Sequence, residues 1–176
     1  MIRRRSALLL GCGGMLTGAL AGCGFTPVYA PTPDGAGTSP TLAAIEVKPI
    51  YERPGQLLSE SLKARLASDS GVPHRFDLQV FFSITAEGQG ILSGTQITRV
   101  RITGAANWVL TKTDPARTKL TEGGDRVSDG VDTFDSQYFA TDLGIEAAQR
   151  RIADRIAEKI VLRLATWFRQ NPTAAG

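Results

Sequence analysis

The chain has 176 residues, of which 20 are Lys or Arg and 17 are Asp or Glu. Hydrophobic residues make up 42% and charged residues 21%, a balance that excludes wholesale disorder and indicates one globular domain. The excess of positive charge comes from Arg3, Arg4 and Arg5, because without residues 1–22 the basic and acidic residues are equal in number, 17 each. The composition therefore gives no support for nucleic-acid binding, which depends on a basic surface.

The first 22 residues have the pattern of a bacterial lipoprotein signal peptide. The basic start is followed by an apolar segment, Ser6–Leu20, which is too short to span a bilayer. Leu20-Ala21-Gly22-Cys23 then matches a lipobox, so we expect cleavage before Cys23 and acylation of its thiol. The alternatives are an ordinary cleaved signal or, from the arginine run, a twin-arginine signal. Gly24, where Asp would favour retention in the inner membrane, predicts an anchor on the periplasmic side of the outer membrane.

The mature chain is predicted to hold a tether and one domain. Residues 23–41 should form the lipid anchor and a flexible tether, because Pro, Gly and small polar residues dominate from residue 30 onward. A single domain should cover residues 42–170, with a tail over 171–176. Cys23 is the only cysteine left after cleavage, which excludes a disulfide framework, a thiol catalyst and a cysteine-based zinc site.

The first half of this domain alternates between strand and helix patterns. Leu42–Ile50 is predicted as a first strand, and Gln56–Ser70 as an amphipathic helix with leucines at every fourth residue. Alternating apolar residues then predict two long strands, Arg75–Glu87 and Gln96–Thr113. A turn at Gly88–Gly90 should join them.

A further strand and a long helix complete the pattern. Arg117–Thr133 is a weaker strand, in which Gly123, Gly124 and Gly130 indicate bulges or a broken edge. Thr141–Gln170 is a helix whose apolar ridge recurs at every fourth residue, namely at Ile152, Ile156, Ile160, Leu164 and Phe168. The order β-α-β-β-β-α predicts an α+β fold: a two-layer sandwich of a mainly antiparallel four-stranded sheet with two helices on one face.

Two rows of basic residues are the candidate binding residues. Arg99 and Arg101 share the polar face of their strand, and a second row recurs along the long helix at Arg151, Arg155, Lys159 and Arg163. In one interpretation these are solvated flanks whose aliphatic stems cover the core. In the other they form an amphiphile site, with guanidinium groups on phosphates and apolar neighbours on acyl chains. The strand pair ranks first because it projects from the face opposite the helices.

The sequence contains no catalytic motif, phosphate loop, dinucleotide fingerprint or metal-ligand spacing. We therefore predict no enzymatic activity, no cofactor and no metal. The alternative is a lipid-anchored periplasmic enzyme or enzyme inhibitor, and an enzyme should show a cleft with convergent titratable groups. A protein that acts by binding a partner should instead show a polar sheet or loop surface that only the partner covers.

Several short motifs occur in a definite order along the predicted mature chain. The segment directly after the lipidated cysteine reads Gly24-Phe25-Thr26-Pro27-Val28-Tyr29. The later motifs are Ile45-x-Val47-x-Pro49-Ile50, Arg53-x-Gly55-Gln56-x-Leu58, Phe76-x-Leu78-x-Val80, Thr98-Arg99 with Ala106-x-Trp108-x-Leu110, and Ile156-Ala157-x-x-Ile160-x-x-Arg163-Leu164. Together and in this order, the motifs resemble the LptE family of lipopolysaccharide-assembly lipoproteins.

This resemblance runs from Cys23 to Leu164 and implies an antiparallel sheet packed with two helices. LptE proteins sit inside the outer-membrane β-barrel LptD, assist its assembly and bind lipopolysaccharide. The resemblance therefore implies that the chain plugs and supports the LptD barrel and binds lipopolysaccharide during its delivery to the outer leaflet. Arg99 lies within a matching motif, whereas the helix row rests on its spacing alone.

Overall fold

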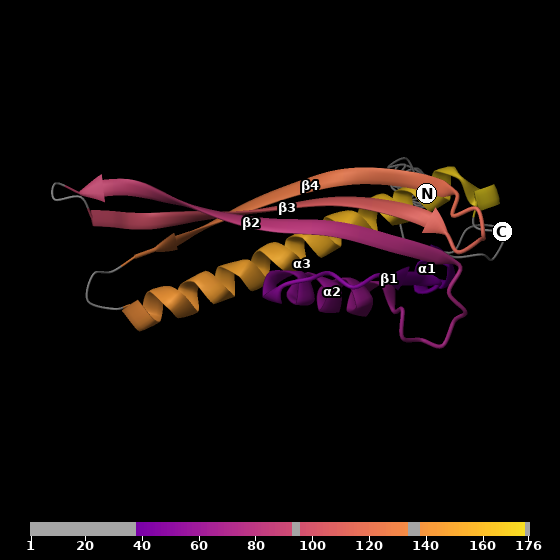
Figure 1. Cartoon of the computed structure of the whole chain (residues 1–176), viewed down its shortest axis with the longest axis horizontal. Coiled ribbons are helices and arrows are strands. Elements are labelled where there is room, and N and C mark those ends of the chain that lie inside the picture. Colours follow the sequence, from indigo (N-terminus) through magenta and orange to yellow (C-terminus); the bar gives the residue numbers. More distant parts are fainter. Residues whose placement is uncertain (1–37, 93–95, 134–137, 175–176) are drawn as a thin grey trace, which may run out of the picture.

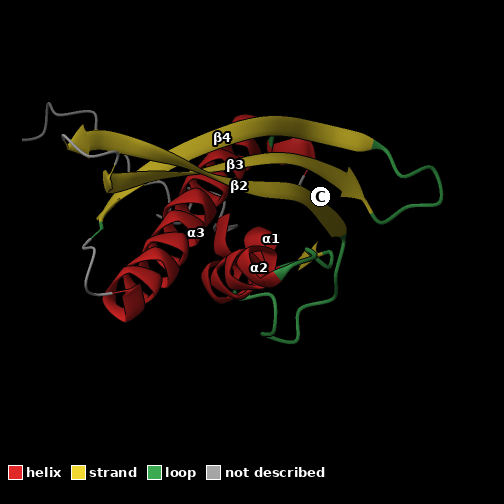
Figure 2. Cartoon of the chain, turned by 60° about the vertical axis from the view of Figure 1, so that its left-hand side comes forward, coloured by secondary structure: helices red, strands yellow, loops and turns green. Residues whose placement is uncertain are grey.

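The computed structural model describes residues 38–92, 96–133 and 138–174, and these form an elongated molecule with a sheet lying over helices (Figure 1). The two layers are also apparent in Figure 2. The predicted α+β class and two-layer arrangement are confirmed. The elements are α1 (Thr38–Ala43), β1 (Ile45–Val47), α2 (Arg53–Leu66), β2 (Phe76–Leu92), β3 (Gln96–Lys112), β4 (Lys119–Asp132), α3 (Tyr138–Gln170) and a 3₁₀ turn, Pro172–Ala174.

The sheet has the strand order β1-β2-β3-β4. β2 pairs antiparallel with β3 along its whole length, from Phe76 opposite Lys112 to Leu92 opposite Gln96, and β4 pairs antiparallel with β3. β1 pairs parallel with β2, because α2 forms the crossover that returns the chain to the same end of the sheet. The sheet is therefore mixed rather than purely antiparallel.

Most of the segment predicted as the first strand is not a strand. Thr38–Ala43, which includes the last residues of the predicted tether, is helical, and only Ile45–Val47 pairs with β2. The residues from Leu42 to Ile45 are all buried, so they do not alternate as a half-buried strand would, and Pro49 has no N–H for further pairing. The described part of the chain thus contains three α-helices instead of the two predicted.

Further element boundaries also differ from the prediction, two of them because Pro and Gly each fit more than one structure. α2 begins at Arg53 rather than Gln56, since Pro54 is tolerated in the first turn of a helix, and it ends where Ala67 adopts a φ of 54°. β2 continues through Gly88–Gly90 to Leu92, so the turn predicted at these glycines is wrong. The connection between β2 and β3 falls at 93–95, outside the described residues.

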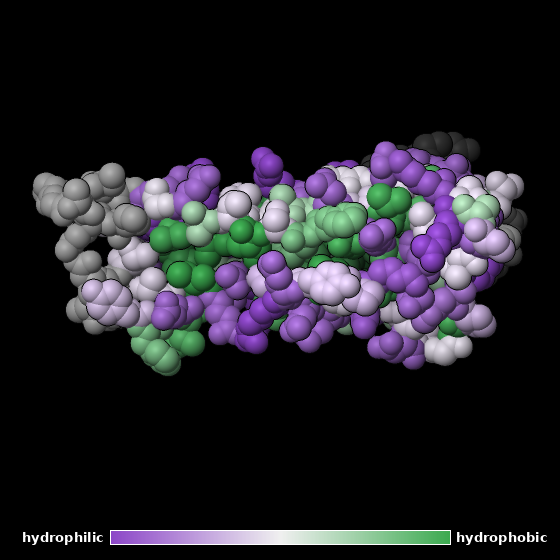
Figure 3. Space-filling model, in the orientation of Figure 1, coloured by the Kyte–Doolittle hydropathy of each residue, from purple (hydrophilic) through white to green (hydrophobic). Residues whose placement is uncertain are grey.

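The apolar ridge of α3 forms the centre of the core, as predicted. Ile152, Ile156, Ile160 and Leu164 are completely buried, and Phe168 nearly so. Gly104 of β3 permits this close packing, since a Cβ atom there would overlap the Ile152 side chain. Hydrophobic surface remains visible as a band between sheet and helices (Figure 3). Neither α3 nor any other helix of the described residues is long and apolar enough to cross a membrane.

The glycines of β4 do not break the strand. The register with β3 is regular from Arg99 opposite Asp132 to Leu110 opposite Thr121, and its one irregularity lies between Leu110 and Thr111. Gly123 lies under the Trp108 ring, where a Cβ atom would be 2.6 Å from the ring carbon Cζ2. The bulges predicted at the glycines are therefore wrong, because these positions make room for large side chains of β3.

Candidate functional site

The face of the sheet turned away from α2 and α3, which we call the open face, carries the predicted strand pair. Along β3, Ile102 is buried toward the helices, whereas Arg99 and Arg101 are exposed. Successive side chains of a strand point to opposite faces, so both arginines lie on the open face. The structure thus brings Arg99 and Arg101 together where the alternation predicted them.

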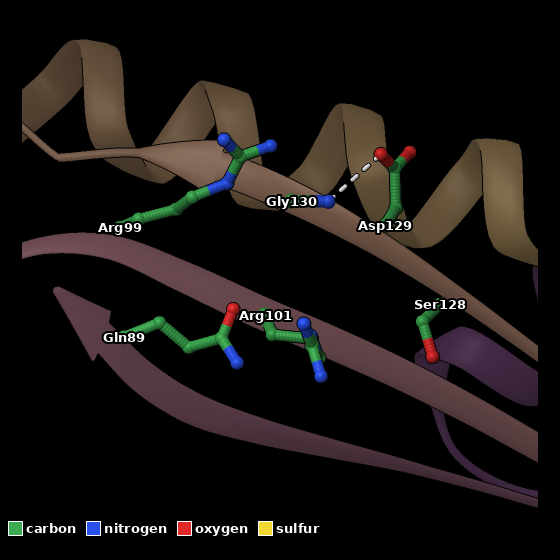
Figure 4. A pocket seen from close by; sticks show the side chains of 6 residues that line it. All are labelled: Gln89, Arg99, Arg101, Ser128, Asp129 and Gly130. Carbon is green, nitrogen blue, oxygen red and sulfur yellow. Dashed lines mark hydrogen bonds between the residues drawn. The ribbon is translucent and has the colours of Figure 1, made fainter.

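The two arginines line a shallow hollow of about 490 Å³ on this face. We call it the open-face basic site; Figure 4 shows its residues, which are Gln89, Arg99, Arg101, Ser128, Asp129 and Gly130. Three strands contribute to it, because Gln89 of β2 is directly opposite Arg99, and Gly130 of β4 is directly opposite Arg101. The sequence analysis missed the residues from β2 and β4, whose proximity depends on the strand register.

Arg99 lies across β4 and over Gly130. A Cβ atom at Gly130 would be only 2.7 Å from Nε and Nη2 of the guanidinium, so a glycine is needed for this position of the arginine. Arg99 Nε is also 3.8 Å from a carboxylate oxygen of Asp132. Both side chains are more than half exposed, so this ion pair contributes little to stability. The guanidinium therefore remains accessible to a ligand.

Arg101 occupies the middle of the site and makes no ion pair or side-chain hydrogen bond with any residue of the described segments. Its cross-strand neighbours are Glu87 and Gly130. A guanidinium group has five N–H donors in a planar fork that matches a phosphate or carboxylate. Arg101 can thus bind an anionic group without first breaking a contact within the chain.

The basic row of α3 lies at the edge of β4, where three of its four members contact that strand. The contacts are Arg151 Nε to Asp129 at 2.8 Å, Lys159 Nζ to the carbonyl of Arg126 at 3.1 Å, and Arg163 Nη2 to Asp125 at 3.1 Å. Asp125 is buried and also accepts a hydrogen bond from the Trp108 indole. Arg155 is exposed and makes no ion pair within the described residues. These contacts hold α3 against β4, as expected for a flank of the core.

Asp129 connects the helix row to the open-face basic site. Burial by itself would raise the pKa of Asp129. The hydrogen bonds from Arg151 and from the Gly130 N–H, together with the charges of Arg151 and Arg155, outweigh burial and lower the pKa below its ordinary value. The folded state therefore favours the ionised carboxylate.

This shift predicts a contribution to stability that depends on pH. A carboxyl group with a lowered pKa in the folded state stabilises above its unfolded pKa of about 3.9 and loses this effect as the pH falls through the folded value. We expect Arg151→Gln to lower the free energy of unfolding by about 0.5–1 kcal/mol at pH 7, since Arg151 is half-exposed, and by less at pH 3. Thermal melts at pH 7, 5 and 3 test this, with Arg65→Gln as the control. Equal losses for Arg151→Gln at all three values would contradict it.

Exposed apolar side chains lie on the first turns of α3, at the same end of the molecule as the open-face basic site. Tyr138 is 79% exposed and Phe139 77% exposed, and Leu143 is also exposed. The helix begins next to the end of β4, because a Cβ atom at Gly144 would be 2.9 Å from the Val131 side chain. Apolar groups and the two arginines thus occur near one end of the domain, a combination suited to an amphiphile or a protein surface.

The described residues form a small two-layer α+β domain that carries a basic hollow on the open face of its sheet. The family model described as LptE, lipopolysaccharide-assembly, matches residues 42–164. The chain therefore belongs to the LptE family of lipopolysaccharide-assembly lipoproteins, as its motifs predicted.

Two solved lipoprotein structures are similar to this chain. A lipoprotein from Caulobacter crescentus CB15 is similar with a TM-score of 0.63 and 27% identity, over 77% of this chain and 98% of that chain. The rare lipoprotein B from Shewanella oneidensis has a TM-score of 0.55 and 10% identity, over 69% of this chain and 92% of that chain, and shows the shared fold. A search of the curated proteins found no match.

Proposed function

We propose that this chain is an outer-membrane lipoprotein that plugs and supports the LptD β-barrel and binds lipopolysaccharide during its delivery to the outer leaflet. The observation that carries the proposal is Arg101, a guanidinium without an ion-pair partner in the described residues, in the middle of a basic site on the open face of an LptE-family domain. The chain contributes binding and positioning, and no chemical step is assigned to it.

The binding mode follows from the chemistry of the site. The phosphates of lipopolysaccharide would lie against Arg101 and Arg99, which can form paired, charge-assisted hydrogen bonds with them. The acyl chains would contact the exposed apolar residues Phe139 and Leu143 at the same end of the domain. Arg155 and its neighbours on α3 rank second, because Arg151, Lys159 and Arg163 already bind to β4.

The partnership with the barrel is tested by co-purification. We expect LptD to co-purify with an affinity-tagged full-length chain from detergent-solubilised outer membranes, in about equal amounts. A matched preparation of an unrelated tagged lipoprotein from the same membranes serves as the control. Recovery of the chain without the barrel, or with a periplasmic enzyme in its place, would overturn the proposal in favour of an enzyme or inhibitor role.

The lipid anchor is tested separately. We expect the mature protein to begin at Cys23 with acyl chains on its thiol, because Leu20-Ala21-Gly22-Cys23 matches the lipobox. Several acyl chains, at ~0.8 kcal/mol per buried methylene, would hold the domain stably on the membrane. Mass spectrometry of the N-terminal peptide decides the question, with Cys23→Ser as the unmodified reference. Cleavage at another position, or an unmodified Cys23, would contradict the prediction.

A further inference from the structure

The two outer edges of the sheet differ in how their backbone groups are satisfied. The odd-numbered residues of β4 turn their N–H and C=O groups toward β3, because Thr133 N, directly after the strand, donates to the Thr98 carbonyl of β3. The even-numbered residues therefore turn these backbone groups outward. Two of these outward groups are bound by side chains of this chain. The carbonyl of Arg126 accepts from Lys159 Nζ at 3.1 Å, and the Gly130 N–H donates to the Asp129 carboxylate at 2.9 Å. A basic side chain of α3 and a carboxylate of β4 itself thus occupy part of this edge, which hinders further pairing there.

Within the described residues, the backbone groups on the outer edge of β2 are hydrogen-bonded at the beginning of the strand alone. Phe76 N donates to the Ala44 carbonyl at 3.3 Å, and Lys48 N donates to the Leu78 carbonyl at 3.0 Å. The even-numbered residues of β2 therefore turn their backbone N–H and C=O groups outward, away from β3. The register with β3 continues without irregularity, so the same holds for Val80, Phe82, Ile84, Ala86 and Gly88. In the parts of the chain that the structure describes, no strand pairs with this stretch.

Among the described residues, no strand continues β1 along this edge. After Lys48 the chain turns away at Pro49, and a groove of about 340 Å³ opens between residues 48–52 and β2. Two aromatic side chains border it, Tyr51 at 84% and Phe81 at 61% exposure. Beyond the groove, the hydrophobic band of Figure 3 runs between the sheet and the helices.

We propose that an extended segment of the LptD barrel adds to β2 as a strand in continuation of β1; this inference rests on the function proposed above. Hydrogen-bonding groups at every second residue, roughly 6.8 Å apart, match an extended polypeptide and not an acyl chain. A plug is enclosed by its barrel, and backbone groups that lose water without gaining a partner cost free energy. On the proposed function the barrel would cover this edge, and a strand supplied by the barrel would satisfy the backbone groups that have no partner in the described residues.

The pattern of β2 also defines the kind of segment that fits. Phe82 and Ile84 turn their half-buried side chains toward the helices, while Ser83 and Thr85 face the open side. The added strand should alternate likewise, with apolar residues beside Phe82 and Ile84. Residues 24–37 of this chain fit poorly, because they carry Pro27, Pro31 and Pro33, which cannot donate to a ladder.

Hydrogen exchange at single-residue resolution tests the added strand. The amides of Phe82, Ile84 and Ala86 should exchange rapidly in the separately purified full chain and about a hundredfold more slowly in the complex with LptD. The amides of Ser83 and Thr85, which face β3, should be protected in both samples and serve as internal controls. If the complex forms and the three outward amides still exchange as in the free chain, the added strand is wrong while the barrel partnership stands.

A proline variant tests the same edge by affinity. Ala86→Pro removes an outward N–H without removing a hydrogen bond to β3, and we expect about tenfold or greater weakening of LptD binding. Ala86→Val keeps the N–H, and Glu122→Pro makes the equivalent change on the edge of β4; both should bind as the parent does. Thermal melts show which variants are folded, and the exchange experiment on the parent chain does not depend on them. Equal affinity of a folded Ala86→Pro variant would overturn the proposal.

If another segment than one of the barrel occupied the outer edge of β2, the hydrogen-exchange results would differ. Protection of the outward amides in the free chain that rises with protein concentration would identify a second copy, and protection that disappears when residues 24–37 are deleted would identify the N-terminal segment. Either result would replace the barrel segment as the occupant. Failure of the chain to bind LptD at all would overturn the proposed function together with this inference.

Discussion

Ile156→Asp should prevent folding. Ile156 is completely buried in the ridge of α3 against the sheet, and an ionised carboxylate there would have no partner. The penalty is comparable with the whole stability of a domain of this size, about 5–15 kcal/mol. Ile156→Ala and Ile160→Ala should each lower the free energy of unfolding by ~2–5 kcal/mol, through lost burial and the cavity that remains.

Denaturant midpoints of the chain without residues 1–23 measure these losses. Glu158→Ala is the matched control, because Glu158 lies on the same helix and is exposed, so its loss should be below about 0.5 kcal/mol. A loss below ~1 kcal/mol for both alanine variants of the ridge would contradict the packing of α3 against β3.

Charge reversal of the strand pair should abolish most of the lipopolysaccharide binding. Arg99→Glu together with Arg101→Glu replaces the two guanidinium groups that we propose bind phosphate by repelling carboxylates, and we expect about 100-fold or greater weakening. Raising the salt concentration should weaken binding by the parent chain, because charges at an exposed site are screened over about 10 Å at 0.1 M. Stability should change little, since Arg99 makes only an exposed ion pair and Arg101 makes none with the described residues.

The test compares lipopolysaccharide binding of the variants at two salt concentrations. Lys63→Glu with Arg65→Glu is the matched control, because it changes the net charge equally at exposed positions on α2, in the helix layer. Unchanged affinity of the Arg99 and Arg101 variant would remove this pair from the binding site. Binding by the parent that does not depend on salt would exclude the phosphate mechanism and leave contact with acyl chains.

Regular periodicity in the sequence was sufficient to predict a helix or strand and its buried face wherever one face of the element is buried. The four-residue spacing from Ile152 to Phe168 predicted the buried ridge of α3, and the alternation along β3 placed Arg99 and Arg101 on the face opposite Ile102. Burial imposes these periods directly on the chain, so they can be recognised without knowledge of its partners. The order of the motifs likewise predicted the LptE family.

Only the tertiary structure decided which residues from different strands meet. Gly130 permits Arg99 to lie across β4, yet in the sequence it is equally compatible with a bulge. The parallel pairing of β1 depends on the α2 crossover, and the open edge of β2 depends on β1 ending after Val47. The contacts of Arg151, Lys159 and Arg163 with β4 depend on how α3 crosses the sheet. Such long-range contacts follow from register and packing between segments far apart in the chain, which no local pattern of residues encodes.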